Sequence, residues 1–401
     1  MNAPEVMEPE TRAEDTSWSA LSGLNTASGM LVNPRTAEGL SVVLACVGAI
    51  AGGIASLPAY VYRRVGKGRE IDDGHPVADL IRRGPNRWQT WPDFVEWLVA
   101  STLLRGNGLA EMVWDRAGRL VELRPIPWEW VSVQMLPSGR LAYDVTEITS
   151  IYGGQGRMRR LLQGEVIHLK DRSDDGLLGR SRLSRAAATV SAGLVIQEFS
   201  DAIYRNGANP SGFLTAEQKL SPEQTTSLKD QMDQKFAGAG RAGKIMVLSG
   251  GLRWSQMTIS PEDAEMLASR RFTTEELARL FNIPPPIVGI WDNSTFTNSE
   301  TAGRWFAQHT LNGWIRKIET EFNRTVFTAA DPRELSLDLA GFLRGDPESR
   351  WRSHEIALKN RVLTRNEVRE EEGYNPLPDG DNLDPASTPP ADPATVPAVE
   401  V

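Results

Sequence analysis

The sequence predicts an α+β protein, in which a part built from short strands precedes a part built mainly from helices. Residues 58–170 alternate short β-type runs with turn signals, and 164–169 is the clearest strand among them. Two helix starts are unusually clear, because an N-cap Ser stands before an N1 Pro at both Ser221-Pro222 and Ser260-Pro261. A long segment rich in aromatic residues, 301–327, is predicted to be one helix.

The first element of the folded part is predicted to be a buried helix. Residues 41–62 carry no charge, and their number alone would permit a membrane span. Glycine, alanine, Ser56 and Pro58 dilute the hydrophobicity, however. Five apolar residues also recur at helical spacing on one face: Val43, Val47, Ile50, Ile54 and Leu57. We therefore predict a core helix that stops at Pro58, followed by a strand at 59–62.

Local signals place the next elements. Thr90, with Asp93 three residues later, predicts a capped helix start. The run 109–114 is expected to be a strand that ends at the turn 115–118. A helix rich in glycine and alanine is predicted at 182–206.

The later elements also have clear ends. A strand is expected at 244–248, between the two Ser-Pro helix starts. The second of those helices is ended by three prolines at 284–286. Thr364, with Glu367 three residues later, forms another capping box, and its helix should close at Gly373.

The composition argues against tight binding to DNA. The chain has 44 Lys and Arg against 52 Asp and Glu, a formal net charge of −8. A protein that grips DNA usually clusters cations that displace the counterions of the phosphates. The one basic cluster, at 153–160, is interpreted as an exposed hairpin tip, with a DNA contact as the alternative. Any contact with nucleic acid is therefore expected to be weak, transient or repulsive.

We find no pattern typical of catalysis or metal binding. The segment 238–244 resembles a phosphate-binding loop, but Ile245 occupies the position that needs Ser or Thr to hold magnesium. His354 would need a second histidine four residues later to form a zinc-protease helix, and Leu358 stands there. We expect no catalytic residue, no metal, no cofactor and no enzyme activity.

Two other reactive side chains are predicted to be structural. His168 lies in an apolar strand and is expected to be a core residue with satisfied hydrogen bonds. Cys46 is the only cysteine, which excludes an intrachain disulfide and fits a reducing compartment. Its apolar neighbours favour a small buried hydrophobe over a nucleophile.

One ordered set of short motifs lies between residues 260 and 300: Ser260–Glu265, Arg271-Phe272, Glu276–Pro285, Val288-Gly289, Asn293–Phe296, Asn298 and Glu300. This set resembles the signature of the tailed-bacteriophage portal protein family, of the siphovirus-like head–tail connector type. Weaker matches are spread along the chain, among them Gly106-Asn107-Gly108, Gly164–His168 and Asn206–Gly212. The likeness covers about residues 35–375, and the ordered set of matches is what makes it specific.

The resemblance implies a portal fold with an α/β wing, a two-helix stem, a small α/β clip, a tunnel loop with a long helix, and a short helical crown. The implied parts are a disordered N-terminus (1–30), the wing (31–181), the first stem helix (182–207), the clip (208–260), the second stem helix (261–284), the tunnel loop (285–300), the long helix (301–330), the crown (331–378) and a disordered C-terminal tail (379–401).

The resemblance also implies a function. About twelve subunits would form a ring at one capsid vertex, and double-stranded DNA would pass through the ring during packaging and ejection. The implied partners are the terminase large subunit, head–tail connector or adaptor proteins and the major capsid protein, with no membrane. The ring would nucleate procapsid assembly in the host cytoplasm and then remain in the virion. An acidic chain suits such a conduit, because it repels DNA.

The channel-facing residues are expected in the tunnel loop. They are Trp291, Asp292, Asn293, Ser294, Thr295, Phe296, Thr297 and Asn298. These side chains offer hydroxyls, amides, aromatic surface and one acid, without the cations that would hold phosphates tightly. We expect Trp291 or Phe296 to anchor the loop and 293–298 to face the DNA; an ordinary surface connection is the alternative.

Two other classes of protein stay open at this point. A DNA-processing enzyme would need a metal or nucleotide site, and a membrane pore would depend on 41–62 alone. Within the portal family, a virus, a prophage remnant and a gene transfer agent remain three possible origins of the particle.

Overall fold

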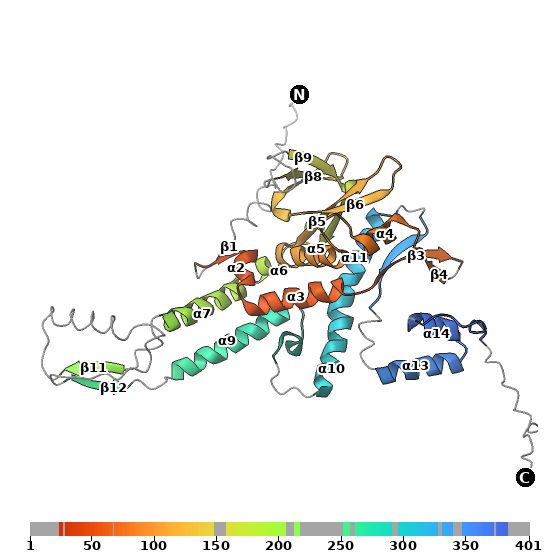
Figure 1. Cartoon of the computed structure of the whole chain (residues 1–401). Coiled ribbons are helices and arrows are strands. Elements are labelled where there is room, and N and C mark those ends of the chain that lie inside the picture. Colours follow the sequence, from red (N-terminus) through yellow and green to blue (C-terminus); the bar gives the residue numbers. More distant parts are fainter. Residues whose placement is uncertain are drawn as a thin grey trace, which may run out of the picture. The chain divides into compact units, whose positions relative to one another are not determined.

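The computed structural model describes most of the chain, and it divides the chain into two compact units, residues 1–339 and 340–401. The described residues are 24–26, 29–66, 68–147, 158–205, 212–216, 252–256, 261–290, 296–327, 331–339, 347–372 and 374–383. Both helices and antiparallel sheets are present, so the predicted α+β class is confirmed (Figure 1).

Within the described part, the first unit contains three sheets of three strands each. The orders are β10-β5-β6, β13-β3-β4 and β7-β8-β9, and every pairing is antiparallel. The strands are β3 (Ala59–Val65), β4 (Gly68–Ile71), β5 (Asn107–Trp114), β6 (Leu120–Ile126), β7 (Val131–Met135), β8 (Leu141–Thr146), β9 (Met158–Leu162), β10 (Val166–Lys170) and β13 (Arg333–Leu337). The strands predicted at 59–62, 109–114 and 164–169 are therefore confirmed, with the last beginning at Val166.

Two-stranded pairs complete the strands of this unit. β1 (Leu24–Asn25) pairs with β2 (Leu31–Val32), and β11 (Gly212–Ala216) pairs with β12 (Leu252–Gln256). The pairing of Ala216 with Leu252 brings the two ends of the long insert between them together. The predicted helix start at Ser221, the strand at 244–248 and the loop-like segment 238–245 lie outside the described residues.

The predicted core helix is confirmed as α3 (Ser41–Ala55). All five residues predicted to face the core are buried, including Leu57 just beyond the helix end. Among the helices of the described ranges, none has the length and apolar character that crossing a membrane requires.

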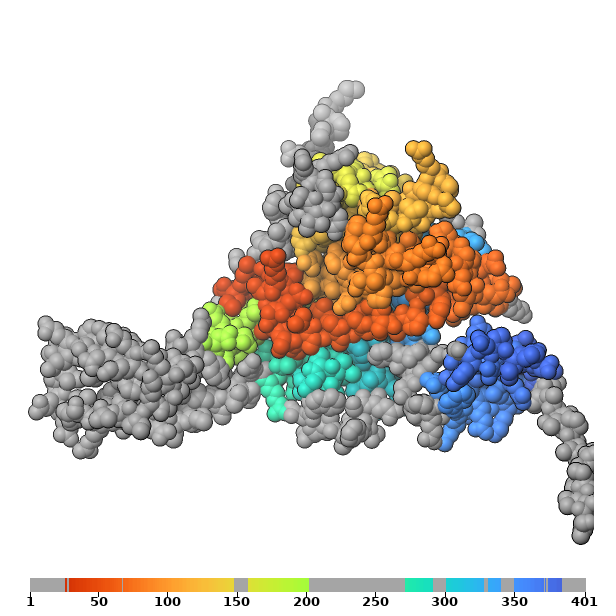
Figure 2. Space-filling model, viewed as in Figure 1, coloured from red at the N-terminus to blue at the C-terminus, as the bar shows by residue number. Residues whose placement is uncertain are grey.

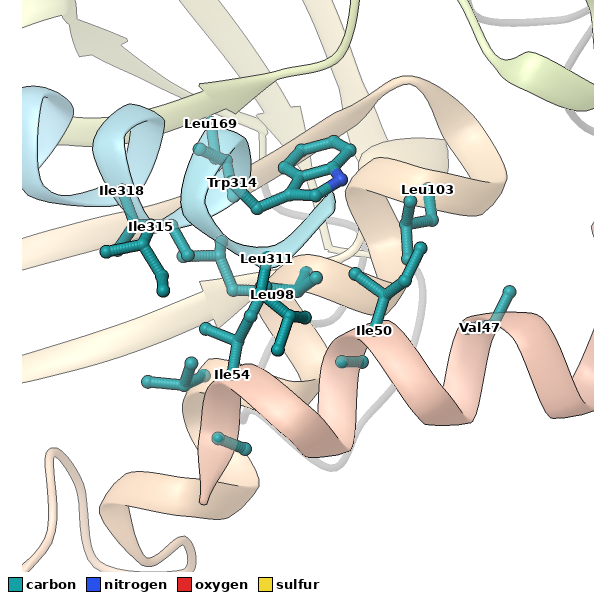
Figure 3. Close-up of a cluster of buried hydrophobic side chains, with 14 of the residues drawn as sticks. Val47, Ile50, Ile54, Leu98, Leu103, Leu169, Leu311, Trp314, Ile315 and Ile318 are labelled. Atoms are coloured by element: carbon teal, nitrogen blue, oxygen red, sulfur yellow. The ribbon is translucent and has the colours of Figure 1, made fainter. Parts of the chain in front are cut away.

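The main core lies where α3 meets α5 (Trp91–Arg105) and α11 (Asn312–Thr325). Figure 3 shows aliphatic side chains of α3 and α5 pointing toward Leu311, Trp314, Ile315 and Ile318. α5 has the predicted capping box, because the Thr90 backbone N–H donates to Asp93 over 3.0 Å and the Asp93 N–H donates to the Thr90 hydroxyl over 3.4 Å. Smaller helices of this unit are α2 (Pro34–Glu38), α4 (Pro76–Arg83), η1 (Trp128–Trp130) and η3 (Gln163–Glu165).

The helix predicted at 182–206 is divided in two. α6 (Arg182–Arg185) stops at Ala186, whose backbone leaves the helical region, and α7 (Ala187–Arg205) follows. α7 packs against α9 (Pro261–Leu280), which runs back toward α3 (Figures 1 and 2). In Figure 2 the described part of α9, in teal, lies directly beneath α3, in red.

The long aromatic-rich helix is confirmed but begins earlier than Thr301. It consists of α10 (Phe296–Trp305), a π-helical stretch η6 (Phe306–Leu311) and α11. β13 follows and pairs with β3, with Leu335 opposite Val61. The crown predicted from 331 therefore starts too early, because 333–337 belong to a sheet of the first unit.

The second unit contains α13 (Pro347–Lys359) and α14 (Arg365–Glu371). Thr364 and Glu367 form the predicted capping box, whereas Gly373 lies outside the described residues. The Asn366 amide nitrogen donates to the Leu377 carbonyl over 2.9 Å and to Asp381 over 2.8 Å. The disordered tail predicted from 379 therefore starts too early, because Asp381 is fixed to α14.

Candidate functional site

The base of the α7–α9 helix pair is held by one arginine. Arg182 begins α6, and its Nε donates to Asp171 over 2.8 Å while its Nη1 donates to the carbonyl of Leu280 over 3.2 Å. The guanidinium also lies over the Trp314 ring, 5.4 Å from its centroid. Asp171 follows β10, Leu280 ends α9 and Trp314 belongs to α11. Arg182 therefore joins a sheet, a helix of the pair and the long helix at one point.

A lysine strengthens the same junction. The Lys317 ammonium donates to the Lys170 carbonyl over 3.1 Å and lies 5.0 Å from the centroid of the Trp314 ring. Burial lowers the pKa of Lys317 below its ordinary value, because the charged form loses solvation, and the nearby charge of Arg182 acts in the same direction. Two cations, Arg182 and Lys317, thus lie near the Trp314 ring.

The end of α9 is fixed by the backbone. Asn282 has a φ of 60°, in the left-handed region, and the N–H of Ile283 donates to the Ala278 carbonyl over 3.0 Å. This is the Schellman pattern of helix termination, in which Asn replaces the usual glycine. The prolines at 284–286 follow, as predicted, and lead into the short η5 (Pro285–Val288) and Gly289.

Asn282 also joins α9 to the long helix. Its Nδ2 donates to the His309 carbonyl over 3.4 Å and to the Thr310 hydroxyl over 3.3 Å. The Thr310 hydroxyl in turn donates to the Asn282 carbonyl over 2.5 Å. His309 and Thr310 lie in η6, where the wider π-helical turn changes the backbone hydrogen bonding. The end of α9 is therefore attached to the irregular part of the long helix.

In the sequence, the predicted channel-facing residues lie between Asn282, at the end of α9, and Thr310, in η6. Trp291, Asp292, Asn293, Ser294 and Thr295 fall outside the described residues. Phe296, Thr297 and Asn298 form the start of α10 rather than the end of a loop. The sequence does offer a signal for this early start, because Thr295, directly before Phe296, is a residue type that favours the N-cap position.

His168 is a core residue with satisfied hydrogen bonds, as predicted. It is buried, and its ring stacks on Trp128 with centroids 5.4 Å apart. The Tyr143 hydroxyl lies 3.0 Å from Nδ1, and Nε2 lies 2.9 Å from Asn107 Oδ1. Burial lowers the pKa of His168 to about 3, because the charged ring would lose its solvation. The neutral ring therefore donates to Asn107 and accepts from Tyr143.

Cys46 is also structural. It is fully buried, and burial raises the pKa of its thiol to about 12. A search of the described residues finds no group of three or more His, Cys, Asp or Glu side chains that could hold a metal ion.

The two described arginines of the basic cluster, Arg159 and Arg160, form ion pairs within the first unit. Arg159 pairs with Glu147 over 3.0 Å and with Glu111, and Arg160 pairs with Asp144 over 2.7 Å. Arg159 also lines a pocket of about 250 Å³ together with Trp88, Arg124, Pro125, Ile126, Trp130, Val145 and Glu147. These pairs leave the described part of the cluster little charge to offer DNA.

Comparisons with known proteins agree along most of the chain. The family model for phage portal proteins matches residues 41–373. The portal protein of Enterobacteria phage HK97 is 28% identical over 356 residues, which cover 87% of this chain and 82% of that protein. The probable portal protein of Streptomyces phage phiC31 is also 28% identical, over 365 residues that cover 89% of this chain and 79% of that protein.

Solved structures extend the comparison. The neck of an empty gene transfer agent particle contains a chain with a TM-score of 0.61 and 27% identity, covering 86% of this chain and 93% of that chain. The neck of the native particle, computed with C12 symmetry, contains a chain with a TM-score of 0.58 and 26% identity, and the match covers 86% of this chain and 92% of that chain. The crystal structure of an HK97-family portal protein from Corynebacterium diphtheriae matches with a TM-score of 0.52 and 15% identity, covering 81% of this chain and 99% of that chain. At this identity the match shows the shared fold alone.

Proposed function

Because the chain belongs to the phage portal protein family, we propose that about twelve copies form a closed ring through which double-stranded DNA passes. The ring would stand at one capsid vertex of a virus or gene transfer agent particle. The match to the family over 41–373 carries this proposal. The C12 symmetry of a similar neck structure supports the number of subunits.

Within this ring, α7 and α9 would be the stem, and the insert that includes β11 and β12 would be the clip. The clip would dock the terminase large subunit during packaging and connector or adaptor proteins afterwards. Its position favours this role, because an insert between two helices can change without disturbing the core. The wing would contact the major capsid protein and nucleate procapsid assembly in the host cytoplasm.

The segment 291–298 would line the narrowest part of the channel. It lacks Lys and Arg, and the whole chain has a net charge of −8. Such a surface repels phosphates and lets DNA slide, which a conduit needs. The protein would act as a structural subunit without catalytic turnover.

Assembly of the purified protein tests the ring. Multi-angle light scattering at rising protein concentration should show a species of about twelve times the 44.2 kDa chain, and negative-stain images should show a central hole. A monomer of 44.2 kDa at every concentration would contradict the proposed function.

A further inference from the structure

One face of α7 is apolar and uncovered. Ala188, Ala192, Val195 and Phe199 are all exposed, and they recur at intervals of four, three and four residues. Phe199 is 56% exposed and Val195 is 38% exposed. This spacing makes one continuous stripe along a helix, as in the seam of a coiled coil. Apolar side chains gathered in this way mark a contact surface more often than single exposed ones do.

The stripe does not face α9. α7 meets α9 through Gly193, where a Cβ would lie 3.3 Å from Thr273 and 3.6 Å from Leu277. Gly193 is about 140° around the helix from Val195 and Phe199, on average, at 100° per residue. The stripe is therefore available to a third helix.

α9 offers a face of matching chemistry. Phe272 is 63% exposed, and Arg271 is exposed beside it, whereas Arg279 pairs with Glu275 over 3.2 Å and with Glu276 over 2.7 Å. The stripe on α7 is flanked by exposed acids, Glu198 and Asp201. Acids beside the α7 stripe and an arginine beside Phe272 favour contact between the two faces.

We propose that the α7 stripe of one copy packs against the Phe272 face of α9 in the next copy around the ring. This inference rests on the proposed ring. A head-to-tail contact between two different faces is the kind that closes a cyclic assembly. Each copy would then use its α7 stripe on one side and its α9 face on the other.

Ring symmetry also sets the register. With the α7–α9 pair placed along the ring axis, as the stem of the proposed ring, rotation about that axis keeps every residue at the same height, so contacts between copies join residues of similar height. α7 and α9 run in opposite directions, and Gly193 lies level with the stretch between Thr273 and Leu277. Phe272 therefore lies about level with residue 196, between Val195 and Phe199. Arg271 lies about level with Glu198.

Engineered cysteines test this arrangement directly. Cys46 is fully buried, so it adds no background. We expect oxidation of the Val195→Cys/Phe272→Cys protein to give a ladder of linked chains, up to the full ring, on a non-reducing gel. Each single variant should stay a single chain. A linked dimer from Val195→Cys alone would show that the stripe pairs with itself, and no ladder from the double variant would show that the faces do not meet; either result overturns the inference.

Charged substitutions provide a second test. Phe199→Asp should raise the protein concentration needed for ring formation by about tenfold or more. Val121→Asp is the matched control, because Val121 is exposed on β6, away from both helices. Glu198→Arg should weaken the ring, and Arg271→Glu in the same chain should restore it. Circular dichroism on each variant confirms that the fold is kept.

The outcomes separate this inference from the proposed function. If the wild-type chain forms no ring, the proposed function fails. If the wild-type ring forms and Phe199→Asp forms it equally well, the ring stands and the contact inferred here is wrong.

Discussion

Asn282 and Thr310 are joined by two hydrogen bonds of opposite direction, 28 residues apart in the chain. The amide of Asn282 donates to the threonine hydroxyl, and that hydroxyl donates to the Asn282 carbonyl. Thr310 is buried, so its hydroxyl cannot easily exchange its bond to the Asn282 carbonyl for one to water. This pair attaches the end of α9 to the long helix.

Substitutions at Asn282 should separate two contributions to the unfolding free energy, that of its left-handed backbone and that of its side-chain hydrogen bonds. Asn282→Gly keeps the left-handed backbone accessible but removes the amide, and should cost about 1 kcal/mol of unfolding free energy. Asn282→Val adds the strain of a β-branched residue at positive φ, and should cost about 3 kcal/mol. Chemical denaturation measures both values. Equal stability of the Val and Gly variants would contradict this account of Asn282.

Arg182→Met should destabilise the protein by about 3 kcal/mol, because Asp171 would keep a buried charge without its partner. Asp171 is 6% exposed. The double variant Asp171→Asn/Arg182→Met should lose less than the single one, since the unpaired charge is gone. Denaturant unfolding of the wild type, both single variants and the double variant gives the coupling energy. A double variant that is less stable than Arg182→Met would show that the pair does not act in this way.

Stability should fall as the pH is lowered below 6.5, and His168 should be one cause. Its pKa is lowered to about 3 in the folded protein, so the unfolded chain binds the proton first. The contribution of His168 to stability is fully present above the ordinary histidine pKa and is lost progressively toward pH 3. The loss amounts to about 2 kcal/mol at pH 5. His168→Gln should reduce the difference in stability between pH 7 and pH 5. An equal difference in the His168→Gln variant and the wild type would contradict this role of His168.

Ser294→Lys and Thr295→Lys should leave ring assembly intact but lower the yield of DNA-filled particles. The added cations would attract the phosphates and slow the moving DNA. Ser132→Lys, on an exposed position of β7, is the control for added charge. Particles are separated into filled and empty fractions by density. Wild-type yields from both loop variants would show that this segment does not line the channel.

Shortening the clip should abolish docking of the terminase without affecting folding of the chain. The pairing of Ala216 with Leu252 allows 217–251 to be replaced by an Asn-Gly turn that closes the hairpin. We expect a soluble protein with the thermal stability of the wild type and no binding to the terminase large subunit. Wild-type affinity for the terminase after this replacement would contradict the role given to the clip.

Features set by neighbouring residues were predictable from the sequence. The Thr90 and Thr364 caps and the end of α9 at the prolines follow from side chains within one turn of the boundary. The burial of α3 followed from its spacing of apolar residues. The portal family itself was identifiable because its signature falls on such local features.

Features set by distant contacts were not predictable. β13 pairs with β3 across most of the chain, and nothing in the residues of β13 indicates which distant strand it joins. The break at Ala186 involves no proline or glycine, so its sequence looks like continuous helix. Arg182 resembles a solvated residue at a helix start, and only the fold shows that it meets Asp171, Leu280 and Trp314.

The π-helical stretch η6 makes the direction of α10 depend on a single residue. A π-helix of this kind is an α-helix that holds one residue more than regular winding needs. Removing one residue from 306–311 would let regular winding continue from α11 into α10. The start of α10 would then turn by about 100° and move by about 1.5 Å along the axis. The length of η6 thus determines how the start of α10 is oriented relative to α11, and chains of this family with one residue more or fewer at this place should orient it differently.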